Sequence, residues 1–475
     1  VGGLGCVPLS AAKASRVGTN MSRPNIVFEF AVQQRSDTLG GYGQPLGVTP
    51  KMDALGANGT RYENAFTCQP VCGPARASLQ TGRYATEVGC EINGRALPFG
   101  SVKTLAQSFN EAGYATAYVG KWHLATDHAA GINYETSAIP QERRGGYRDY
   151  WMAADVLEFT SHGYNSYVYN ADNERVPFMG YRADCINNFA IDFLHGRKEQ
   201  TEPFFLFISQ IEPHHQNDRR RYEGPDGSRA QFADFQAPGD LVACSKACEQ
   251  GTDISNWREN YPDYLGCCHS LDYNVGRLVD TLKEQGMWEN TILVYTADHG
   301  SHFLTRGREA EYKRTCHDAS IHIPLIITGP GFTGGNVVRN VVSLLDVSAT
   351  LLACAGIERP EGWRGRDLRP LAAGRTEGWE DVAFLQISES RVGRAIRTPD
   401  YTYAVRAEGD GYRVFASDVY YEEFFYVLKD DPFQQNNLAA DSAWAETRAH
   451  LAELLQCKMV QAGERPPEIR PFRAW

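Results

Sequence analysis

The sequence predicts an α/β protein: a large, mostly parallel sheet sandwiched by helices, followed by a smaller antiparallel sheet with a terminal helix. Three observations support this prediction. Short apolar runs recur along most of the 475 residues, helical patterns lie between them, and after about residue 375 the pattern changes to short strands and one helix. We therefore expect an N-terminal remnant or tag at 1–21, a catalytic domain at 22–375 and a C-terminal subdomain at 376–475.

Apolar runs rich in branched and aromatic residues predict the strands of the large sheet. They are NIVFEF at 25–30, PFFLFIS at 203–209, TILVYTA at 291–297 and PLIIT at 324–328. Continuous apolar strands are typical of parallel sheets that helices cover on both faces. In such sheets ligands bind just beyond the carboxyl ends of the strands, so polar residues at those ends are the candidates for a site.

Helices are expected between and after these strands. Residues 271–286 carry apolar side chains at helical spacing and stop at Gly286, which suits a helix C-terminus. Residues 344–356 predict a more buried helix, and residues 442–461 predict the terminal one. Between them, the short runs AFLQIS, GRAIRT, YTYAVRA and EEFFYVL predict the small antiparallel sheet.

Composition excludes some classes of function. The formal charge of -11, from 47 basic and 58 acidic residues, comes without a basic stripe, so we expect no nucleic-acid partner. No apolar run approaches the roughly 20 residues that cross a bilayer, so we expect a soluble chain without a membrane partner. A cytoplasmic location is favoured over a periplasmic or secreted one.

The twelve cysteines are sparse and irregularly spaced, which does not predict a disulfide scaffold. Cys244 with Cys248, or Cys267 with Cys268, could suggest zinc, but neither pair has a second ligand pair at the usual spacing. We expect most of these thiols to be buried and inert.

Cys72 is the exception. It opens the stretch CGPARASLQTGR, and Pro74 suits the first turn of a helix. A cysteine at a helix N-terminus lies where free N–H groups favour an anion, so its thiol should be acidic, and Arg76 could bind an oxyanion. The alternative is a half-buried cysteine in an ordinary cap region.

Four further polar clusters lie at or beside predicted strands. They contain Lys121 and His123; His214 and His215; Asp298, His299 and His302; and Lys313 and His317. Each cluster alone would more often be a solvated loop, but strand ends of one sheet converge in space. Together they offer cations, an acid beside a histidine and a reactive thiol, which suits binding a tetrahedral oxyanion with help from a metal. No glycine-rich phosphate loop follows the first strand, which disfavours nucleotide binding.

These motifs resemble those of the sulfatase family. CGPARASLQTGR matches the signature C-x-[PSA]-[SA]-R followed by T-G-R, and GKWHL, EPHH, YTADHG and YVLKDDPFQQNNL extend the resemblance from Arg23 to the C-terminal region. The resemblance implies the alkaline phosphatase superfamily fold and conversion of Cys72 to formylglycine by a maturation enzyme. In that family the hydrated aldehyde attacks sulfur, the alcohol leaves, and the second hydrate oxygen expels sulfate.

The resemblance also implies a role for each matched residue. Arg76 would hold the hydrate and the sulfate, while Lys121 and His123 would bind sulfate oxygens. His214 and Lys313 would protonate the leaving oxygen or neutralise its charge. The implied calcium ligands are Gln33, Asp298 and His299. His215, His302 and His317 are candidates to bind the rest of the substrate, with hydrogen-bond support of the site as the alternative.

One position departs from the family pattern. Val32 stands where sulfatases usually carry the first metal-binding carboxylate, which leaves Gln33 as a neutral oxygen ligand and predicts weaker calcium binding. Two alternatives therefore stay open beside sulfate-ester hydrolysis. One is an impaired homologue that binds sulfated glycans, and the other is a phosphodiesterase or phosphonate monoester hydrolase on the same fold.

The substrate is expected to be a sulfated carbohydrate or small sulfate ester. Glu389 and Arg391 are candidates for a rim that contacts sugar hydroxyls. Cys68, four residues before Cys72, is expected to be a packing residue.

Overall fold

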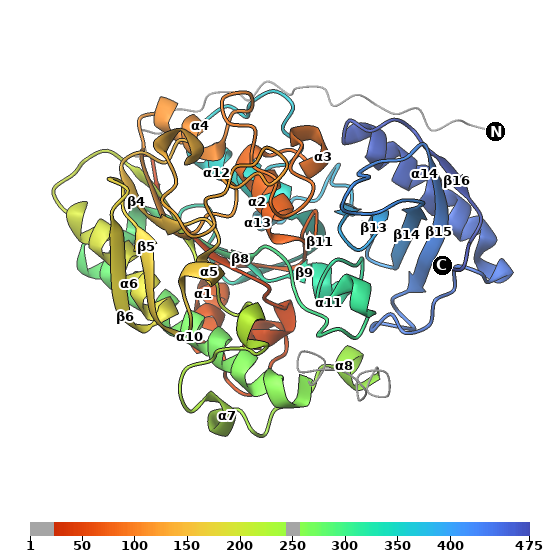
Figure 1. The fold of residues 1–475 in the computed structure, drawn as a ribbon, viewed down its shortest axis with the longest axis horizontal. Coiled ribbons are helices and arrows are strands. Elements are labelled where there is room, and N and C mark those ends of the chain that lie inside the picture. The colour runs from red at the N-terminus through yellow and green to blue at the C-terminus, as the bar shows by residue number, and fades with distance from the viewer. Residues whose placement is uncertain (1–22, 244–256) are drawn as a thin grey trace.

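The computed structural model describes residues 23–243 and 257–475. It has two sheets, a large one flanked by helices and a separate five-stranded one (Figure 1). The predicted α/β fold class is confirmed. The large sheet runs in the order β11-β2-β10-β8-β1-β7-β3-β4-β5-β6, and β9 pairs with β2 at one side.

The centre of the large sheet is parallel. It consists of β8 (Thr291–Ala297), β1 (Asn25–Ala31), β7 (Phe204–Ser209), β3 (Ala115–Lys121) and β4 (Tyr150–Ala154). β3, β7 and β8 are buried along their whole length, as continuous apolar runs predict. Their carboxyl ends meet at one edge of the sheet, which is where the candidate site lies.

The flanks of the sheet contain the antiparallel pairs. β10 (Leu325–Thr328) runs against both β8 and β2 (Thr60–Phe66), and β9 (His322–Ile323) also runs against β2. The segment between β8 and β10 holds only single helical turns, too little for the crossover that a parallel pair needs. β11 (Asn336–Ser343) is parallel to β2, while β5 (Tyr164–Tyr169) and β6 (Arg175–Tyr181) close the other flank.

Helices cover both faces of this sheet (Figure 1). One layer contains α1 (Pro50–Asn58), α6 (Arg182–Gly196) and α10 (Trp257–Glu284); the other contains α2 (Cys72–Thr81), α4 (Leu105–Glu111) and α12 (Leu344–Cys354). The short helices are α3 (Ala85–Val88), α5 (Leu157–Thr160), α7 (Ser228–Gln231), α8 (Gly239–Ala243), α11 (Asp318–Ile321) and α13 (Arg369–Ala372). Single 3₁₀ turns are η1 (Ser36–Thr38), η2 (Gly40–Tyr42), η3 (Gln141–Arg143), η4 (Asn217–Arg219), η5 (Trp288–Asn290), η6 (Arg308–Ala310) and η7 (Ser442–Trp444).

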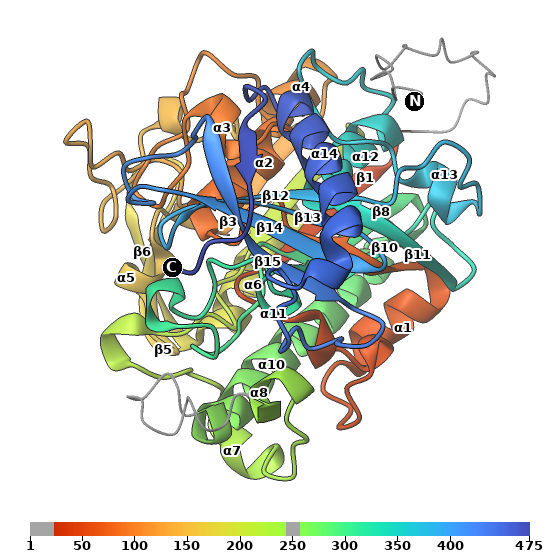
Figure 2. The ribbon, with the colours of Figure 1, turned by 90° about the vertical axis from the view of Figure 1, so that its right-hand side faces the viewer.

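The second sheet contains β12 (Ala383–Ile387), β13 (Val392–Arg397), β14 (Tyr401–Ala407) and β15 (Val419–Val427) in antiparallel order, with β16 (Glu468–Arg470) parallel to β15. The terminal helix α14 (Ala445–Gln461) packs across these strands (Figure 2). A buried apolar cluster that includes Phe66, Cys316 and Leu385 joins the two sheets. The domain limits near 375 remain a prediction.

Within the described ranges, no helix is both long and apolar enough to cross a membrane. The described cysteines are free thiols, and Cys267 and Cys268 are buried in α10. The predictions for residues 1–21, Cys244 and Cys248 lie outside the described residues.

Candidate active site

Cys72 is the first residue of α2, as predicted. Val71 before it is extended, with φ -144° and ψ 133°, and the helix ends at Gly82 in the left-handed region. Every residue of α2 is buried, and the Cys72 side chain faces groups from the ends of several strands. The first turn of the helix therefore presents its N–H groups in a closed, polar site.

The Cys72 sulfur has direct polar partners from distant segments. Lys313 Nζ lies 3.0 Å from Sγ, and His299 Nε2 lies 3.2 Å from it. Interaction with Cys72 raises the pKa of both His123 and His214 against the larger lowering by burial, which places these rings near the same sulfur. The fold thus brings four other predicted site residues to the Cys72 sulfur.

Arg76 lies one helical turn further along α2 and is fixed by the ends of β3 and β7. Its Nη1 donates to the Lys121 carbonyl and to Ser209 Oγ, both at 2.8 Å. Its Nη2 lies 3.9 Å from Asp298 Oδ2 and has no hydrogen-bond partner among the described residues. This buried guanidinium keeps a donor available for an oxyanion.

The charges of the site make Cys72 acidic. Burial alone raises the pKa of this thiol, but Lys121, Lys313 and His299 outweigh burial and bring the pKa well below its ordinary value. Cys68, which is equally buried but lacks these neighbours, has its pKa raised by burial to about 11. The contrast agrees with the prediction of a reactive Cys72 beside a packing Cys68.

The pKa values of Lys121 and Lys313 are shifted in opposite directions. Burial lowers the pKa of Lys121, and the neighbouring Arg76 adds to this effect. The pKa of Lys313 is raised, because its attraction to Cys72 and Tyr312 exceeds the cost of burial. Lys313 is therefore the firmly charged partner of the nucleophile position. Burial holds the pKa of His214 well below its usual range, so its ring is neutral near pH 7.

Glu158, in α5, is a site residue that the sequence reasoning missed. Its Oε2 lies 3.7 Å from His214 Nδ1, and its Oε1 accepts the Asn217 N–H at 2.9 Å. Burial raises the pKa of this carboxyl, while Lys121 and Lys313 oppose the rise. No motif in its neighbourhood indicates the role, because only the fold brings residue 158 to residue 214.

Asp155 is a second missed residue, and it fixes the loop that carries His123. Its carboxylate accepts the backbone N–H groups of Leu124, Ala125 and Thr126 at 2.9–3.0 Å. Its carbonyl accepts the N–H of His123, whose φ of 59° is unusual for a residue other than glycine. The strained loop is thus held by a buried acid.

Asp298 and His299 follow β8 and form the candidate metal group together with Cys72. Among the described His, Cys, Asp and Glu residues, this is the group of three or more whose ligand atoms lie within 4.8 Å of one another. Asp298 Oδ1 accepts two backbone N–H groups, whereas Oδ2 is buried without a hydrogen-bond partner in the described structure. His299 Nδ1 donates to the Gly300 carbonyl at 2.9 Å, so Nε2 is the ring nitrogen that faces Cys72.

Gln33 and Val32 limit how well this group fits calcium. The Gln33 amide donates to Tyr222 OH and Ser301 Oγ, and its Oε1 accepts the His215 N–H at 3.4 Å. Val32 is fully buried, and its side chain has no oxygen to offer a metal. Calcium takes six to eight oxygen ligands in proteins, and these residues offer far fewer. The residues present therefore do not make a complete calcium site, and Gln33 as a ligand stays a prediction.

The other predicted substrate contacts lie outside this inner cluster. The His302 ring bonds to the Lys313 carbonyl at 2.8 Å, and the His317 ring bonds to Tyr426 OH at 3.0 Å. His215 bonds to Asn217 at 3.1 Å. All three rings support neighbouring groups, which is the alternative considered above, and substrate contact by any of them stays a prediction.

The two predicted rim residues are also engaged within the protein. Arg391 pairs with Glu423 at 2.5 Å, and Glu389 pairs with Arg314 at 2.6 Å. The side chains of Glu389 and Arg391 are 1% and 4% exposed, which leaves little surface for a sugar.

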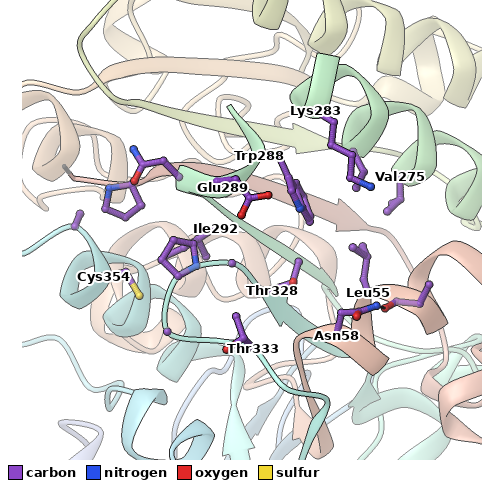
Figure 3. A pocket seen from close by; sticks show the side chains of 18 of the residues that line it. Leu55, Asn58, Val275, Lys283, Trp288, Glu289, Ile292, Thr328, Thr333 and Cys354 are labelled. Atoms are coloured by element: carbon purple, nitrogen blue, oxygen red, sulfur yellow. Dashed lines mark hydrogen bonds between the residues drawn. The ribbon is translucent and has the colours of Figure 1, made fainter. Parts of the chain in front are cut away.

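A cavity of about 1390 Å³ lies at the other edge of the sheet, beside the starts of β1 and β8 (Figure 3). Trp288, Glu289, Lys283 and Asn58 line it together with apolar residues. None of its lining side chains carries a buried polar atom without a partner in the described structure. The cluster at Cys72 is therefore the better candidate for catalysis.

An α/β sheet with a buried acidic thiol, two lysines and an arginine at its carboxyl edge is a site suited to an enzyme that acts on an oxyanion ester. Residues 24–357 match the family described as Sulfatase, and residues 310–461 match the one described as N-sulphoglucosamine sulphohydrolase, C-terminal. The chain belongs to the sulfatase family, and its class of activity is that of a sulfuric ester hydrolase.

Named relatives agree with this assignment. The chain is 30% identical over 455 residues to the ulvan-active sulfatase of Formosa agariphila, covering 93% of this chain and 82% of that protein. It is 25% identical over 518 residues to the N-acetylglucosamine-6-O-sulfatase of Bacteroides thetaiotaomicron, covering 94% and 88%.

Solved structures confirm the fold. One is a protein in complex with its substrate D-glucosamine-2-N,6-O-disulfate, with a TM-score of 0.72 and 23% identity over 93% of this chain and 98% of that chain. Another is the phosphonate monoester hydrolase of Agrobacterium radiobacter, with a TM-score of 0.69 and 22% identity over 92% and 96%. The fold is thus shared by enzymes of different ester classes.

Proposed function

We propose that this protein hydrolyses sulfate esters of carbohydrates with formylglycine, made from Cys72, as the nucleophile. The observation that supports this most directly is the position of Cys72 at the start of α2, 3.0 Å from Lys313 Nζ and 3.2 Å from His299 Nε2. The Cys72 sulfur stands where the oxygens of the hydrated aldehyde would lie. Once formed, that group would supply the oxygen nucleophile and the means of releasing sulfate.

The protein's own residues bind and orient the ester. Arg76 and Lys121 carry cationic donors to the sulfate oxygens and stabilise the charge that develops on them. Neutral His214 can relay a proton to the leaving oxygen, and charged Lys313 can offset the negative charge that develops there. Burial of these groups excludes water and strengthens each interaction.

The carbohydrate class is supported by the relatives, since their names include an ulvan-active sulfatase and an N-acetylglucosamine-6-O-sulfatase. Calcium binding is proposed as weak or lost. Val32 replaces an expected carboxylate, and of the implied ligands Gln33, Asp298 and His299 only Asp298 offers a buried oxygen without a partner in the described structure. The maturation enzyme that converts Cys72 is the second proposed partner.

Phosphonate or phosphodiester hydrolysis is the second candidate, favoured by the fold shared with a phosphonate monoester hydrolase. Sulfate monoesters, phosphonate monoesters and phosphodiesters all carry one negative charge, so charge does not separate them. Relative rates on a panel of sulfated sugars, an aryl sulfate and an aryl phosphonate monoester do. Preference for the phosphonate by the matured protein would contradict the proposal.

A peptide mass map tests the nucleophile. The tryptic peptide from Tyr62 to Arg76 contains both Cys68 and Cys72, so Cys68 serves as an internal control. After co-expression with a maturation enzyme, we expect conversion of Cys72 alone. Cys72→Ala should abolish sulfate release, whereas Cys68→Ala should retain it. An intact Cys72 thiol in an active preparation would refute the covalent mechanism.

A further inference from the structure

The turn between β12 and β13 reaches from the second sheet into the region around Cys72. This turn contains Ser388, Glu389 and Ser390, which follow the last residue of β12. Glu389 has a φ of 62°, a left-handed conformation that is uncommon for glutamate. Its backbone N–H donates to the Gly411 carbonyl at 2.9 Å, so the strained conformation is held in place.

The Glu389 carboxylate joins two loops of the catalytic domain. Its Oε1 accepts the Asn93 N–H at 2.8 Å, and its Oε2 lies 2.6 Å from Arg314 Nη2. The side chain is 1% exposed, so both contacts are made away from solvent. Removing this carboxylate would leave the buried Arg314 paired with Glu311, whose side chain is half-exposed.

Each of these loops ends at a group that surrounds the nucleophile position. The Asn93 side chain accepts the N–H of Gly73, the residue after Cys72, at 2.9 Å. Arg314 directly follows Lys313, whose Nζ bonds to Cys72. The Glu389 carboxylate is therefore connected to Lys313 through one residue, Arg314, and to Cys72 through two, Asn93 and Gly73.

The serines on either side of Glu389 also hydrogen-bond to segments of the catalytic domain. Ser390 Oγ donates to the Arg314 carbonyl at 2.7 Å, and Ser388 Oγ accepts from Gln69 Nε2 at 2.7 Å. In addition, the Arg314 N–H donates to the Pro70 carbonyl at 3.3 Å. The segment before Cys72 and the segment around Lys313 are thus bound to the same turn and to each other.

We propose that Glu389 is a positioning residue, which holds Lys313 and the start of α2 at the spacing that sulfate-ester cleavage needs. This inference rests on the proposed function only for its kinetic consequence. A displacement of about 1 Å in such a pair can cost on the order of 100-fold in rate. Glu389 acts through Arg314 and Asn93 and does not touch the substrate.

The test compares Glu389→Gln with Glu422→Gln. Glu422 is a buried carboxylate of the same sheet, paired with Arg448 and Tyr403 at 3.1 Å, so it matches the cost of losing a buried charge. Hydrogen exchange of peptides spanning 69–76 and 310–316 measures the start of α2 and the segment around Lys313 without reference to catalysis. We expect faster exchange in both peptides of Glu389→Gln and wild-type exchange in Glu422→Gln.

The kinetic readout is the ratio of kcat/KM for an alkyl sulfate to that for an activated aryl sulfate. Because Lys313 assists the leaving oxygen, Glu389→Gln should lose about tenfold or more on the alkyl ester and only a few-fold on the aryl ester. A merely structural role lowers the active fraction and leaves this ratio unchanged. An unchanged ratio together with wild-type exchange in both peptides would overturn the proposal.

Two further outcomes are informative. If the wild-type protein cleaves no sulfate ester, the proposed function fails, and hydrogen exchange alone still decides whether Glu389 holds the loops. If Glu389→Gln does not fold, Arg314→Met removes the other end of the contact and is compared in the same way. Additive effects of Glu389→Gln and Arg314→Met on the kinetic ratio would also contradict the proposal, since partners in one contact are expected to couple.

Discussion

Glu29 is a buried carboxyl in the middle of β1, and it should make the protein less stable as the pH rises. It lies between Ile208 of β7 and Tyr295 of β8 and is fully buried. Gln210 Nε2 donates to Oε1 at 3.0 Å, while Oε2 has no partner in the described structure. Burial raises the pKa of Glu29 from 4.5 to about 8, with Gln210 opposing the rise.

The direction of this pH effect follows from the protonation of Glu29 in the unfolded and in the folded protein. In the unfolded chain the carboxyl ionises above pH 4.5, whereas in the folded protein it stays protonated up to about 8. Folding therefore takes up a proton between these values, and stability falls as the pH rises from 4.5 through 8. A pKa unit is worth about 1.4 kcal/mol, so the full penalty above pH 8 is at most about 5 kcal/mol.

Glu29→Gln removes this penalty. The amide can still accept from Gln210, but its unpartnered NH₂ adds a cost of about 1–3 kcal/mol at every pH. The decisive quantity is therefore the change of the mutational effect with pH. We expect the denaturation midpoint of Glu29→Gln to rise relative to that of wild type as the pH increases from 5 to 8.5. The exposed Glu199→Gln should follow wild type throughout, and a Glu29→Gln difference independent of pH would refute the reasoning.

Three other predictions concern the active site. Lys313→Met should raise the pKa of the Cys72 thiol in unconverted protein, measured by the pH dependence of its alkylation, and should lower kcat of the converted enzyme by about 100-fold; an unchanged thiol pKa would exclude the 3.0 Å contact. Glu158→Gln should lower kcat by about tenfold, as removal of a group that orients the neutral His214, without loss of Cys72 conversion; full activity would mean that the 3.7 Å contact has no catalytic role. Val32→Asp should make sulfate release and melting temperature depend on added calcium, and no gain would show that position 32 is not the missing ligand.

Much of the fold follows from local patterns in the sequence. The continuous apolar runs that form β7 and β8 are long enough to predict buried strands, and Gly286 and Gly356 mark the ends of two helical segments as expected. The antiparallel direction of β10 could not be predicted from its own residues. Direction depends on how the chain returns from β8, and the single turns η6 and α11 leave no crossover helix.

In the candidate site, too, local motifs in the sequence indicate some residues and not others. Cys72, Lys121 and Asp298 lie in motifs beside strand ends, so the sequence indicates them. Glu158 and Glu389 lie in stretches without such motifs. Glu389 meets Asn93 across 296 residues of sequence, and nothing in the local pattern predicts that pairing. The residues that hold the site are less visible in the sequence than those that perform the chemistry.

Cys68 and Cys72 show the physical reason why local sequence predicts only part of the site. They are four residues apart and both are buried, yet burial raises the pKa of Cys68 to about 11 while the pKa of Cys72 falls well below its ordinary value. The difference comes from charges on Lys121, Lys313 and His299, which belong to three distant segments. A local motif can place a thiol at a helix start, but its ionisation depends on the whole arrangement of strand ends. Any change that moves those segments apart should therefore make Cys72 behave like Cys68.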